Sequence, residues 1–170
     1  MNVCIIGEGL TSLALAKNLI NKKINVHIYY KTKIQKKITS RTIGISKNNL
    51  EFFKKEIFEM TKIKYWKIKK IEIYSQKIKN ENIFNFNNEK DDLFYMVKNK
   101  RLYELLKKEV LKSKFIKRIA INKKLNEKNL NKKNYDLIIN SDPNNFIAKK
   151  YFTKKIEKNY FNIAYTAIFK

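Results

Sequence analysis

The opening residues of the chain order apolar and polar positions in a way that predicts a β-α-β unit. Residues 3–6 (Val-Cys-Ile-Ile) are apolar without interruption, which is typical of a strand buried in a parallel sheet. Residues 10–20 place apolar side chains at helical spacing, and residues 25–30 form a second strand-like run after a polar break at 21–23. Two parallel strands joined by a helix are therefore expected at the start of the chain.

Hydrophobic spacing further along predicts two more helices and several strands. A helix over residues 47–60 has Ser46 as its N-cap, because a serine hydroxyl accepts a hydrogen bond from a free backbone N–H of the first turn. A second helix covers residues 100–113. Extended segments are predicted at residues 65–74, 83–86, 93–97, 135–140 and 160–169.

Three of the later segments carry further expectations. Residues 65–74 and 83–86 together predict an antiparallel excursion from the parallel sheet. Residues 122–134, rich in lysine and asparagine, predict a surface turn region. The strand over 135–140 is expected to be buried and to stop at Pro143, which opens a short helix.

Length and organisation predict one domain. The chain has 170 residues, with no repeat and no linker rich in glycine, serine or proline. The fold class expected is α/β, a Rossmann-like FAD/NAD(P)-binding fold with a β-rich excursion. Because the sequence stops inside the predicted strand at 160–169, we expect residues 1–170 to be a single domain that is truncated, with the fold incomplete at its C-terminus.

The charge of the chain is +24, which raises the possibility of a nucleic-acid or anionic membrane partner. Only Arg41, Arg101 and Arg118 are arginine among the 39 basic residues, although the guanidinium fork is the group that suits phosphate recognition. A general bias toward lysine explains the charge more simply. We therefore do not expect a nucleic-acid partner, and a basic nucleic-acid or membrane-surface binding protein is kept as an alternative function.

Cysteine and histidine usage limits the chemistry. Cys4 and His27 are the single residues of their types, so the chain has no intramolecular disulfide, no zinc constellation and no evident catalytic pair. Cys4 is expected to be a small core residue, and His27, on a strand, to serve packing or the surface. Since no segment approaches the roughly 18 apolar residues of a membrane span, we expect a cytoplasmic protein, at most peripheral at the inner face of the membrane.

The strand-to-helix turn carries the main functional signal. It reads Gly7-Glu8-Gly9-Leu10-Thr11-Ser12, a G-x-G-x-x-G dinucleotide fingerprint with serine in the third place. Glycine allows the tight turn and lets a pyrophosphate approach the N–H groups at the positive end of the helix. The second strand ends in Tyr30 where an acid for the ribose is expected, so either the phenol replaces the carboxylate or the contact is absent. The alternative is an α/β domain with an empty crevice.

Several segments in order resemble the flavin-dependent aromatic-ring monooxygenases, most closely the ubiquinone-biosynthesis hydroxylases of the 2-octaprenyl-6-methoxyphenol hydroxylase type. The segments that carry this resemblance are residues 7–16, 40–46, 95–102, 135–142 and 160–169. They look like the family's FAD fingerprint, its arginine-containing segment, the lead into its central helix, the strand before its Asp-Gly motif and the strand that follows.

The resemblance implies a cofactor and a set of contacts. FAD would be bound by the fingerprint residues Gly7, Glu8, Gly9, Leu10, Thr11 and Ser12, by Tyr30 at the place of the ribose-binding acid, by Arg41 beside the flavin-side phosphates, and by Lys100. The chain departs from the family at Ser12, at Tyr30 and at Asp142-Pro143, where Asp-Gly is usual. The family's later Gly-Asp motif has no counterpart.

The implied activity is hydroxylation of an aromatic ring, such as that of a polyprenyl phenol, with NAD(P)H as reductant and O₂ as co-substrate. The cofactor carries that chemistry, so no catalytic residue and no metal ligand is assigned to this chain. The function expected is that of the N-terminal FAD-binding part of such an enzyme, inactive as a fragment. The alternative is a truncated or decayed flavoprotein-like domain without activity.

Overall fold

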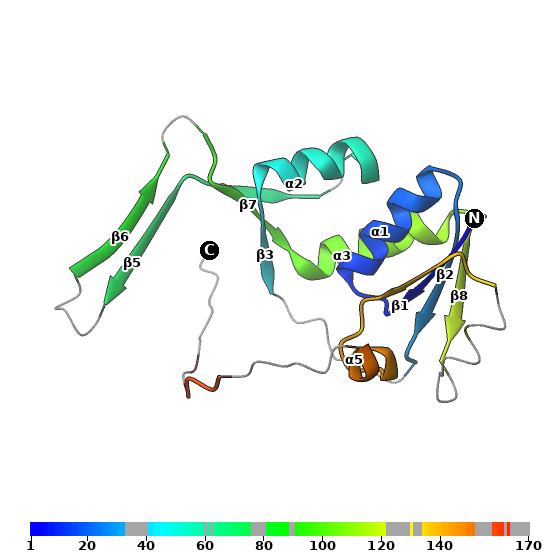
Figure 1. Ribbon diagram of the computed structural model, residues 1–170. Helices are drawn as coiled ribbons and strands as arrows, with labels where there is room; N and C mark the ends of the chain where they lie inside the picture. Colours follow the sequence, from blue (N-terminus) through cyan, green and yellow to red (C-terminus); the bar gives the residue numbers. More distant parts are fainter. Residues whose placement is uncertain are drawn as a thin grey trace.

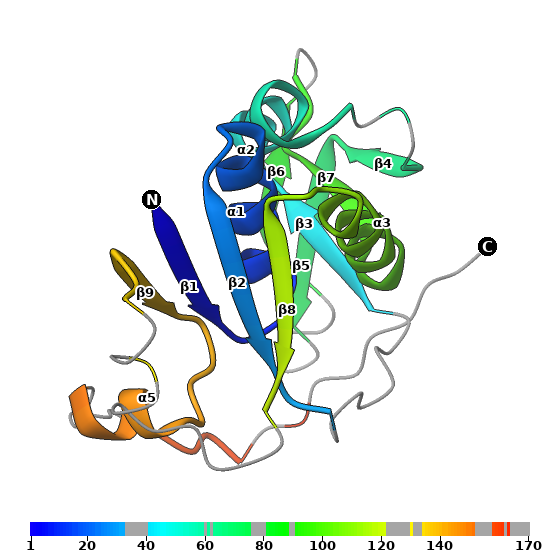
Figure 2. The same cartoon turned by 90° about the vertical axis from the view of Figure 1, so that its right-hand side faces the viewer.

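The computed structural model describes residues 1–32, 41–59, 61, 63–75, 81–88, 91–121, 130, 134–151, 158–161 and 163. Its elements are, in chain order, β1 (Asn2–Ile6), α1 (Leu10–Asn21), β2 (Asn25–Tyr30), β3 (Thr42–Ile45), α2 (Lys47–Phe52), the π-helical turn η1 (Phe53–Ile57), β4 (Tyr65–Ile68), β5 (Lys70–Ser75), β6 (Glu81–Asn87), β7 (Phe94–Lys98), α3 (Asn99–Leu111), β8 (Ile116–Ala120), β9 (Leu137–Asn140) and α5 (Phe146–Tyr151). Figures 1 and 2 show their arrangement in two views.

A four-stranded parallel sheet, in the order β8-β2-β1-β9, forms the centre of the molecule. Alternate residues of β1 face opposite sides of it. Val3 and Ile5 pack in one core cluster with residues of α1 and α3, whereas Cys4 and Ile6 pack in a second cluster with Tyr29. The predicted β-α-β unit and the buried position of Cys4 are thus confirmed. The sheet and its helices form the Rossmann-like α/β fold that the sequence predicts.

Two antiparallel units extend this fold. Strands β3, β7 and β4 form a second sheet, and Ile45 and Val97 from it share the first core cluster with the parallel sheet. Strands β5 and β6 form a hairpin that projects away from the rest of the molecule (Figure 1). The β-rich excursion is therefore confirmed, although the single extended segment predicted at 65–74 divides after Ile68 between the two units.

The predicted helix at 47–60 ends earlier than expected. Ser46 caps it, since its hydroxyl accepts a hydrogen bond from the Asn49 N–H at 3.3 Å. The α-helix stops at Phe52 and continues as the π-helical turn to Ile57, after which Phe58 has an extended backbone. Leu50 in α2 and Ile57 in the π-helical turn are both buried, as the apolar spacing predicts. The spacing of apolar residues therefore did not reveal the change of helix type.

The C-terminal expectations are met only in part. Strand β9 lies at the edge of the parallel sheet in the described residues, with Leu137 44% and Ile138 37% exposed, so the prediction of a buried strand is wrong there. In the predicted turn region 122–134, Leu130 is buried, and apart from the exposed Asn134 the other residues lie outside the described residues. Of the predicted strand 160–169, Tyr160, Phe161 and Ile163 are described and belong to no strand.

In the part of the chain that the structure describes, no helix has both the length and the apolar character needed to span a membrane.

Candidate cofactor-binding site

Gly7 is the residue at which β1 turns into the loop before α1, and its conformation requires glycine. Its φ is +111°, a region that residues with a side chain rarely adopt. A Cβ at this position would also lie 2.8 Å from Ser141 Oγ. The turn is held from the neighbouring strand, because the Gly7 N–H donates to the Tyr29 carbonyl at 2.9 Å. The chain can therefore pass close to the end of β9 only without a side chain here.

Gly9 is the N-cap of α1 and faces open space. A Cβ built there would meet no atom within 4 Å, and the first turn of α1 carries no acidic residue. The first N–H groups of a helix lack partners within the helix, and they carry its partial positive charge. Gly9 thus leaves an uncovered, electropositive position in front of a helix of 12 residues.

Ser12 replaces the third glycine of the fingerprint and points inward. Its side chain is buried, and its hydroxyl forms a short hydrogen bond with the Ser141 hydroxyl, which in turn donates to the Ile6 carbonyl at 3.0 Å. The serine therefore joins α1 to the ends of β1 and β9. The third glycine of the fingerprint usually allows helix and strand to pack closely. Here the hydrogen bond between Ser12 and Ser141 holds the helix against the strand ends.

Glu8, between the two glycines, is bound by three side chains from two elements. Arg118 of β8 donates to both of its carboxylate oxygens, from Nε to Oε1 and from Nη2 to Oε2 at 3.0 Å. From α3, the Tyr103 hydroxyl and Lys107 Nζ donate to Oε2 at 3.3 and 3.2 Å. Burial, and then the charge of Glu8, raise the pKa of Tyr103 above its ordinary value. The carboxylate is thus turned toward β8 and α3 rather than toward the first turn of α1.

Tyr30, the last residue of β2, stands where an acid was expected for the ribose. Its ring is covered by the Arg118 guanidinium, whose central carbon lies 4.1 Å from the ring centroid. This stacking is a cation–π contact. The end of β2 therefore presents an aromatic ring and a guanidinium in place of an acid. The carboxylate found beside them is that of Glu8, in the glycine loop.

Lys31, which directly follows β2, forms an ion pair with Asp142, which lies two residues beyond β9. Lys31 Nζ lies 2.7 Å from Asp142 Oδ2, and the Lys31 side chain is 41% exposed. Burial raises the pKa of Asp142, but the hydrogen bond from Lys31, the Asn144 N–H at 3.0 Å and the Lys31 charge together outweigh it and lower that pKa below its usual range. Asp142 is therefore a carboxylate at neutral pH.

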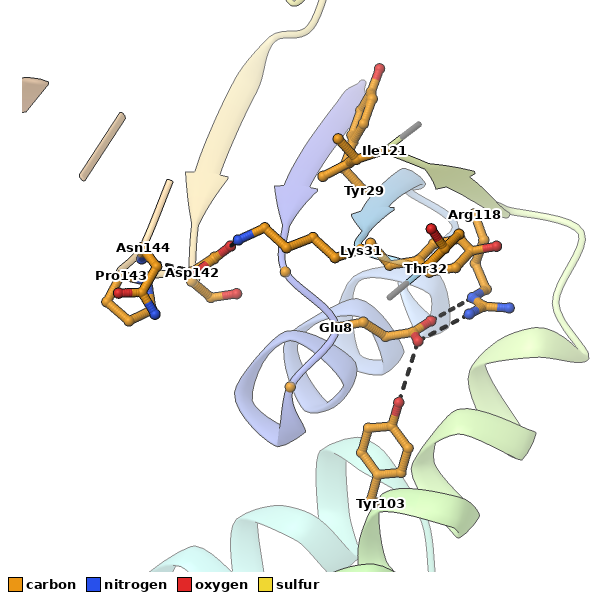
Figure 3. A pocket seen from close by; sticks show the side chains of 14 residues that line it. Glu8, Tyr29, Lys31, Thr32, Tyr103, Arg118, Ile121, Asp142, Pro143 and Asn144 are labelled. Atoms are coloured by element: carbon orange, nitrogen blue, oxygen red, sulfur yellow. Dashed lines mark hydrogen bonds and ion pairs between the residues drawn. The ribbon is translucent and has the colours of Figure 1, made fainter. Parts of the chain in front are cut away.

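Most of these residues, but not Ser12 or Lys107, line one pocket at the carboxyl ends of β1 and β2 (Figure 3). Its volume is about 450 Å³, which lies within the range of small-molecule sites. The lining residues are Gly7, Glu8, Gly9, Tyr29, Tyr30, Lys31, Thr32, Tyr103, Arg118, Ile121, Ser141, Asp142, Pro143 and Asn144. The pocket lies where open α/β sheets bind ligands, in the crevice outside the carboxyl ends of the strands.

The predicted contact residues divide into two groups. Gly7, Glu8, Gly9 and Tyr30 line the pocket together. Leu10 packs against the core, Thr11 is exposed and Ser12 is buried. Arg41 is exposed at the start of β3, where its carbonyl accepts from the Asn99 N–H at 2.9 Å, and Lys100 of α3 is exposed and pairs with Glu104 at 3.9 Å. Their role in binding remains a prediction.

Sequence analysis missed the residues that close the pocket. Lys31, Tyr103 and Arg118 line it, and none belongs to the fingerprint. A partial signal for Arg118 was available, because Ile116–Ala120 is a short run with two β-branched residues a few positions after a helix, as a strand can be. Lys31 and Tyr103 had no such signal, since their partners Asp142 and Glu8 are distant in the sequence.

The residues present fit the ADP half of FAD. The Gly9 position offers space that a Cβ would fill, the N-terminus of α1 supplies unpaired N–H groups for a pyrophosphate, and the charge of Glu8 is bound by basic side chains. The departures from the fingerprint at Ser12 and Tyr30 leave this space open, since Ser12 points inward and Tyr30 forms a pocket wall.

The fold is that of FAD-binding proteins with a Rossmann-like domain. No family model matches the sequence, and no curated protein matches it. The structure of PqsL from Pseudomonas aeruginosa, described as "a probable FAD-dependent monooxygenase", is similar to this chain with a TM-score of 0.64 at 11% identity, over 94% of this chain and 47% of that one. The chain thus spans about half the length of PqsL.

Two further structures show how far the fold extends. The p-nitrophenol 4-monooxygenase PnpA from Pseudomonas putida matches with a TM-score of 0.52 at 10% identity, over 69% of this chain and 30% of that one. A geranylgeranyl bacteriochlorophyll reductase-like protein from Thermoplasma acidophilum matches with a TM-score of 0.51 at 11% identity, over 70% and 29%. Because monooxygenases and a reductase-like protein share it, the fold alone does not select the reaction.

Proposed function

We propose that this chain is the FAD-binding part of a flavin-dependent monooxygenase that hydroxylates an aromatic ring. The observation that carries the proposal is the pocket at the carboxyl ends of β1 and β2, where the open Gly9 position adjoins the N-terminus of α1. The family resemblance of the sequence supports the reaction class, and PqsL and PnpA, two of the proteins that share the fold, are described as a probable FAD-dependent monooxygenase and a monooxygenase.

The chain's own residues bind and orient the cofactor in this proposal. The first N–H groups of α1 would hold the pyrophosphate at the Gly9 position, and the Tyr30 ring and the Arg118 guanidinium would form the wall beside the adenosine. Glu8 fixes Arg118 and thereby the shape of that wall. Reduced flavin, when bound, supplies the oxygen-activating chemistry of such enzymes.

The narrower form of the proposal concerns the substrate and the reductant. The proposed substrate is a polyprenyl phenol of ubiquinone biosynthesis and the proposed electron donor is NAD(P)H; both rest on the sequence resemblance. The proposed attachment to the inner face of the membrane rests on the resemblance and on the charge of +24. Co-sedimentation of the chain with anionic but not neutral vesicles, weakening as salt is added, is the expected result for the membrane part.

Flavin titration of the 170-residue chain tests the proposal. We expect flavin absorption bands to remain with the protein through gel filtration, and ADP to displace the flavin. Riboflavin, which lacks the adenosine and both phosphates, should not compete, because the pocket surrounds the glycine loop. A protein that stays colourless with FAD in excess, and binds no ADP, would argue for a flavoprotein-like domain without the cofactor.

A further inference from the structure

The ion pair between Lys31 and Asp142 spans the carboxyl end of β1. Lys31 directly follows β2, Asp142 lies two residues beyond β9, and β1 lies between these strands in the sheet. Neighbouring strands are about 4.8 Å apart, so the two residues can meet only if their side chains extend across β1. Figure 3 shows the Lys31 side chain extended in this direction, with its amino group at the Asp142 carboxylate.

This position lies across the path of a dinucleotide. Strands β2 and β9 flank β1 on opposite sides, so the chain order reverses direction there, and ligands of such sheets cross that point beside the glycine turn. The pyrophosphate is the part of a dinucleotide that crosses. The ion pair and the pyrophosphate therefore compete for the space above β1.

The pocket layout supports the same interpretation. A second hollow, lined by Ile6, Phe146 and Lys149 among others, shares Lys31, Ile121 and Asn144 with the first pocket. The Lys31 side chain thus lies on the boundary between two adjoining hollows. Movement of Lys31 away from Asp142 would therefore change the boundary between the two hollows.

We propose that Lys31 is a phosphate-binding residue of this site and that Asp142 holds it until a nucleotide enters. The inference rests on the proposed function and deepens it, since it names the residue that pairs with the pyrophosphate. On entry of the ligand, Lys31 turns from the carboxylate to the phosphate oxygens. Asp142 keeps its hydrogen bond from the Asn144 N–H.

Transfer of Lys31 from Asp142 to a phosphate is favourable because of the partners that Arg118 and Lys31 already have. Arg118, the other basic residue lining the pocket in the described part of the chain, binds Glu8 through two nitrogens. The Lys31 side chain is 41% exposed and the Asp142 side chain 17%, so solvent weakens their attraction from the lysine side. A pyrophosphate would offer Lys31 two negative charges in place of the single charge of Asp142, so the attraction to it would be the stronger.

Affinity for ADP, measured by calorimetry at one ionic strength, tests the exchange. We expect Lys31→Met to weaken ADP binding about tenfold, because a charged hydrogen bond is lost and Asp142 is left facing the phosphates. Asp142→Asn should tighten it several-fold, because Lys31 is then free. The double variant should bind ADP several-fold more weakly than wild type, since the gain from the phosphate contact exceeds the cost of the pair.

The double variant decides between exchange and a pair that stays intact. If Lys31 stayed on Asp142 in the complex, replacing a neutral pair by two neutral side chains would leave ADP affinity at the wild-type value, and this result would overturn the inference alone. If neither wild type nor Asp142→Asn binds ADP or FAD, the proposed function fails and the inference with it. Binding by Asp142→Asn but not by wild type supports both.

Two controls separate the phosphate effect from general charge effects. Adenosine, which has no phosphate, should bind all variants alike. The pair Lys47–Asp91, with a 3.0 Å contact and half-exposed side chains, lies outside the pocket. The double variant Lys47→Met and Asp91→Asn changes the same charges and should leave ADP affinity unchanged.

Discussion

Gly7 and Gly9 are needed for different reasons. Gly7 has a positive φ and a backbone in contact with Ser141, so its lack of a side chain serves folding. Gly9 has an ordinary φ of −86° and open space around it, so folding does not require glycine there, and in the proposed function its lack of a side chain leaves room for the ligand. The two glycines of the loop therefore differ: Gly7 is required by the structure, and Gly9 is proposed to serve binding.

Alanine at each position should separate these roles. We expect Gly7→Ala to lower the free energy of unfolding by about 1–3 kcal/mol, the cost of a side chain at a strained φ. Gly9→Ala should change it by less than about 1 kcal/mol, because only the N-cap preference is affected. Urea denaturation measures both. Flavin titration should then show weaker binding by the folded Gly9→Ala variant, and unaltered binding would mean that the space above Gly9 is not used.

Glu8 is a structural brace as well as a pocket residue. Replacing it by glutamine leaves Arg118 and Lys107 without their carboxylate, and the Glu8 side chain is only 10% exposed. We expect Glu8→Gln to cost about 1–3 kcal/mol of stability. The matched variant Glu104→Gln, at an exposed pair on α3, should cost less than about 0.5 kcal/mol. Equal losses of stability for Glu8→Gln and Glu104→Gln in thermal denaturation would show that the contacts of Glu8 with Arg118 and Lys107 contribute no more than an exposed ion pair.

At the scale of elements, the β5–β6 hairpin is separate from the core. Its large apolar side chains, Ile73, Tyr74, Ile83, Phe84 and Phe86, are exposed, and none belongs to either core cluster. Its base is narrow, because the Asn88 N–H donates to the Lys69 carbonyl at 3.1 Å. A two-stranded hairpin of this kind contributes little to the stability of the fold that bears it.

Removal of the hairpin tests this independence. A chain in which Lys69 is joined to Asn88 through a short glycine linker should keep its parallel sheet and lose less than about 1 kcal/mol, because none of the hairpin's described residues belongs to a core cluster. Circular dichroism and urea denaturation measure the two quantities. A loss of several kcal/mol would contradict the expectation and indicate that the hairpin packs on the core in solution.

At the scale of the whole molecule, charge is the dominant feature. With 39 basic and 15 acidic residues, the folded chain repels itself, although Glu8 and Asp142 are each paired. We expect salt to stabilise it. From about 10 mM to 150 mM, the screening length falls from roughly 30 to 8 Å, which weakens repulsion between distant lysines more than contacts inside ion pairs.

Thermal unfolding in increasing sodium chloride measures this effect. A gain on the order of 1 kcal/mol corresponds to a Tm higher by about 2–4 °C for a chain of this length. A Tm that falls with salt would mean that ion pairs such as Glu8–Arg118 outweigh the long-range repulsion.

The sequence by itself determined the local elements of this protein. The apolar run of β1, the helical spacing of α1 and the glycines between them set the β-α-β unit, because period and turn chemistry are properties of neighbouring residues. The position of the pocket at that turn followed from them, and so did the antiparallel excursion. The edge position of β9 did not, because burial depends on which strands pair across the sheet.

Only the tertiary structure decided what surrounds the glycine loop. Glu8 and Arg118 are 110 positions apart, and Ser12 and Ser141 are 129 apart, so no local pattern links them. The same holds for Lys31 and Asp142, which meet because β1 lies between β2 and β9. Local spacing reports the period of a helix or strand, whereas these contacts depend on the order of strands in the sheet, which is set by packing of the whole chain.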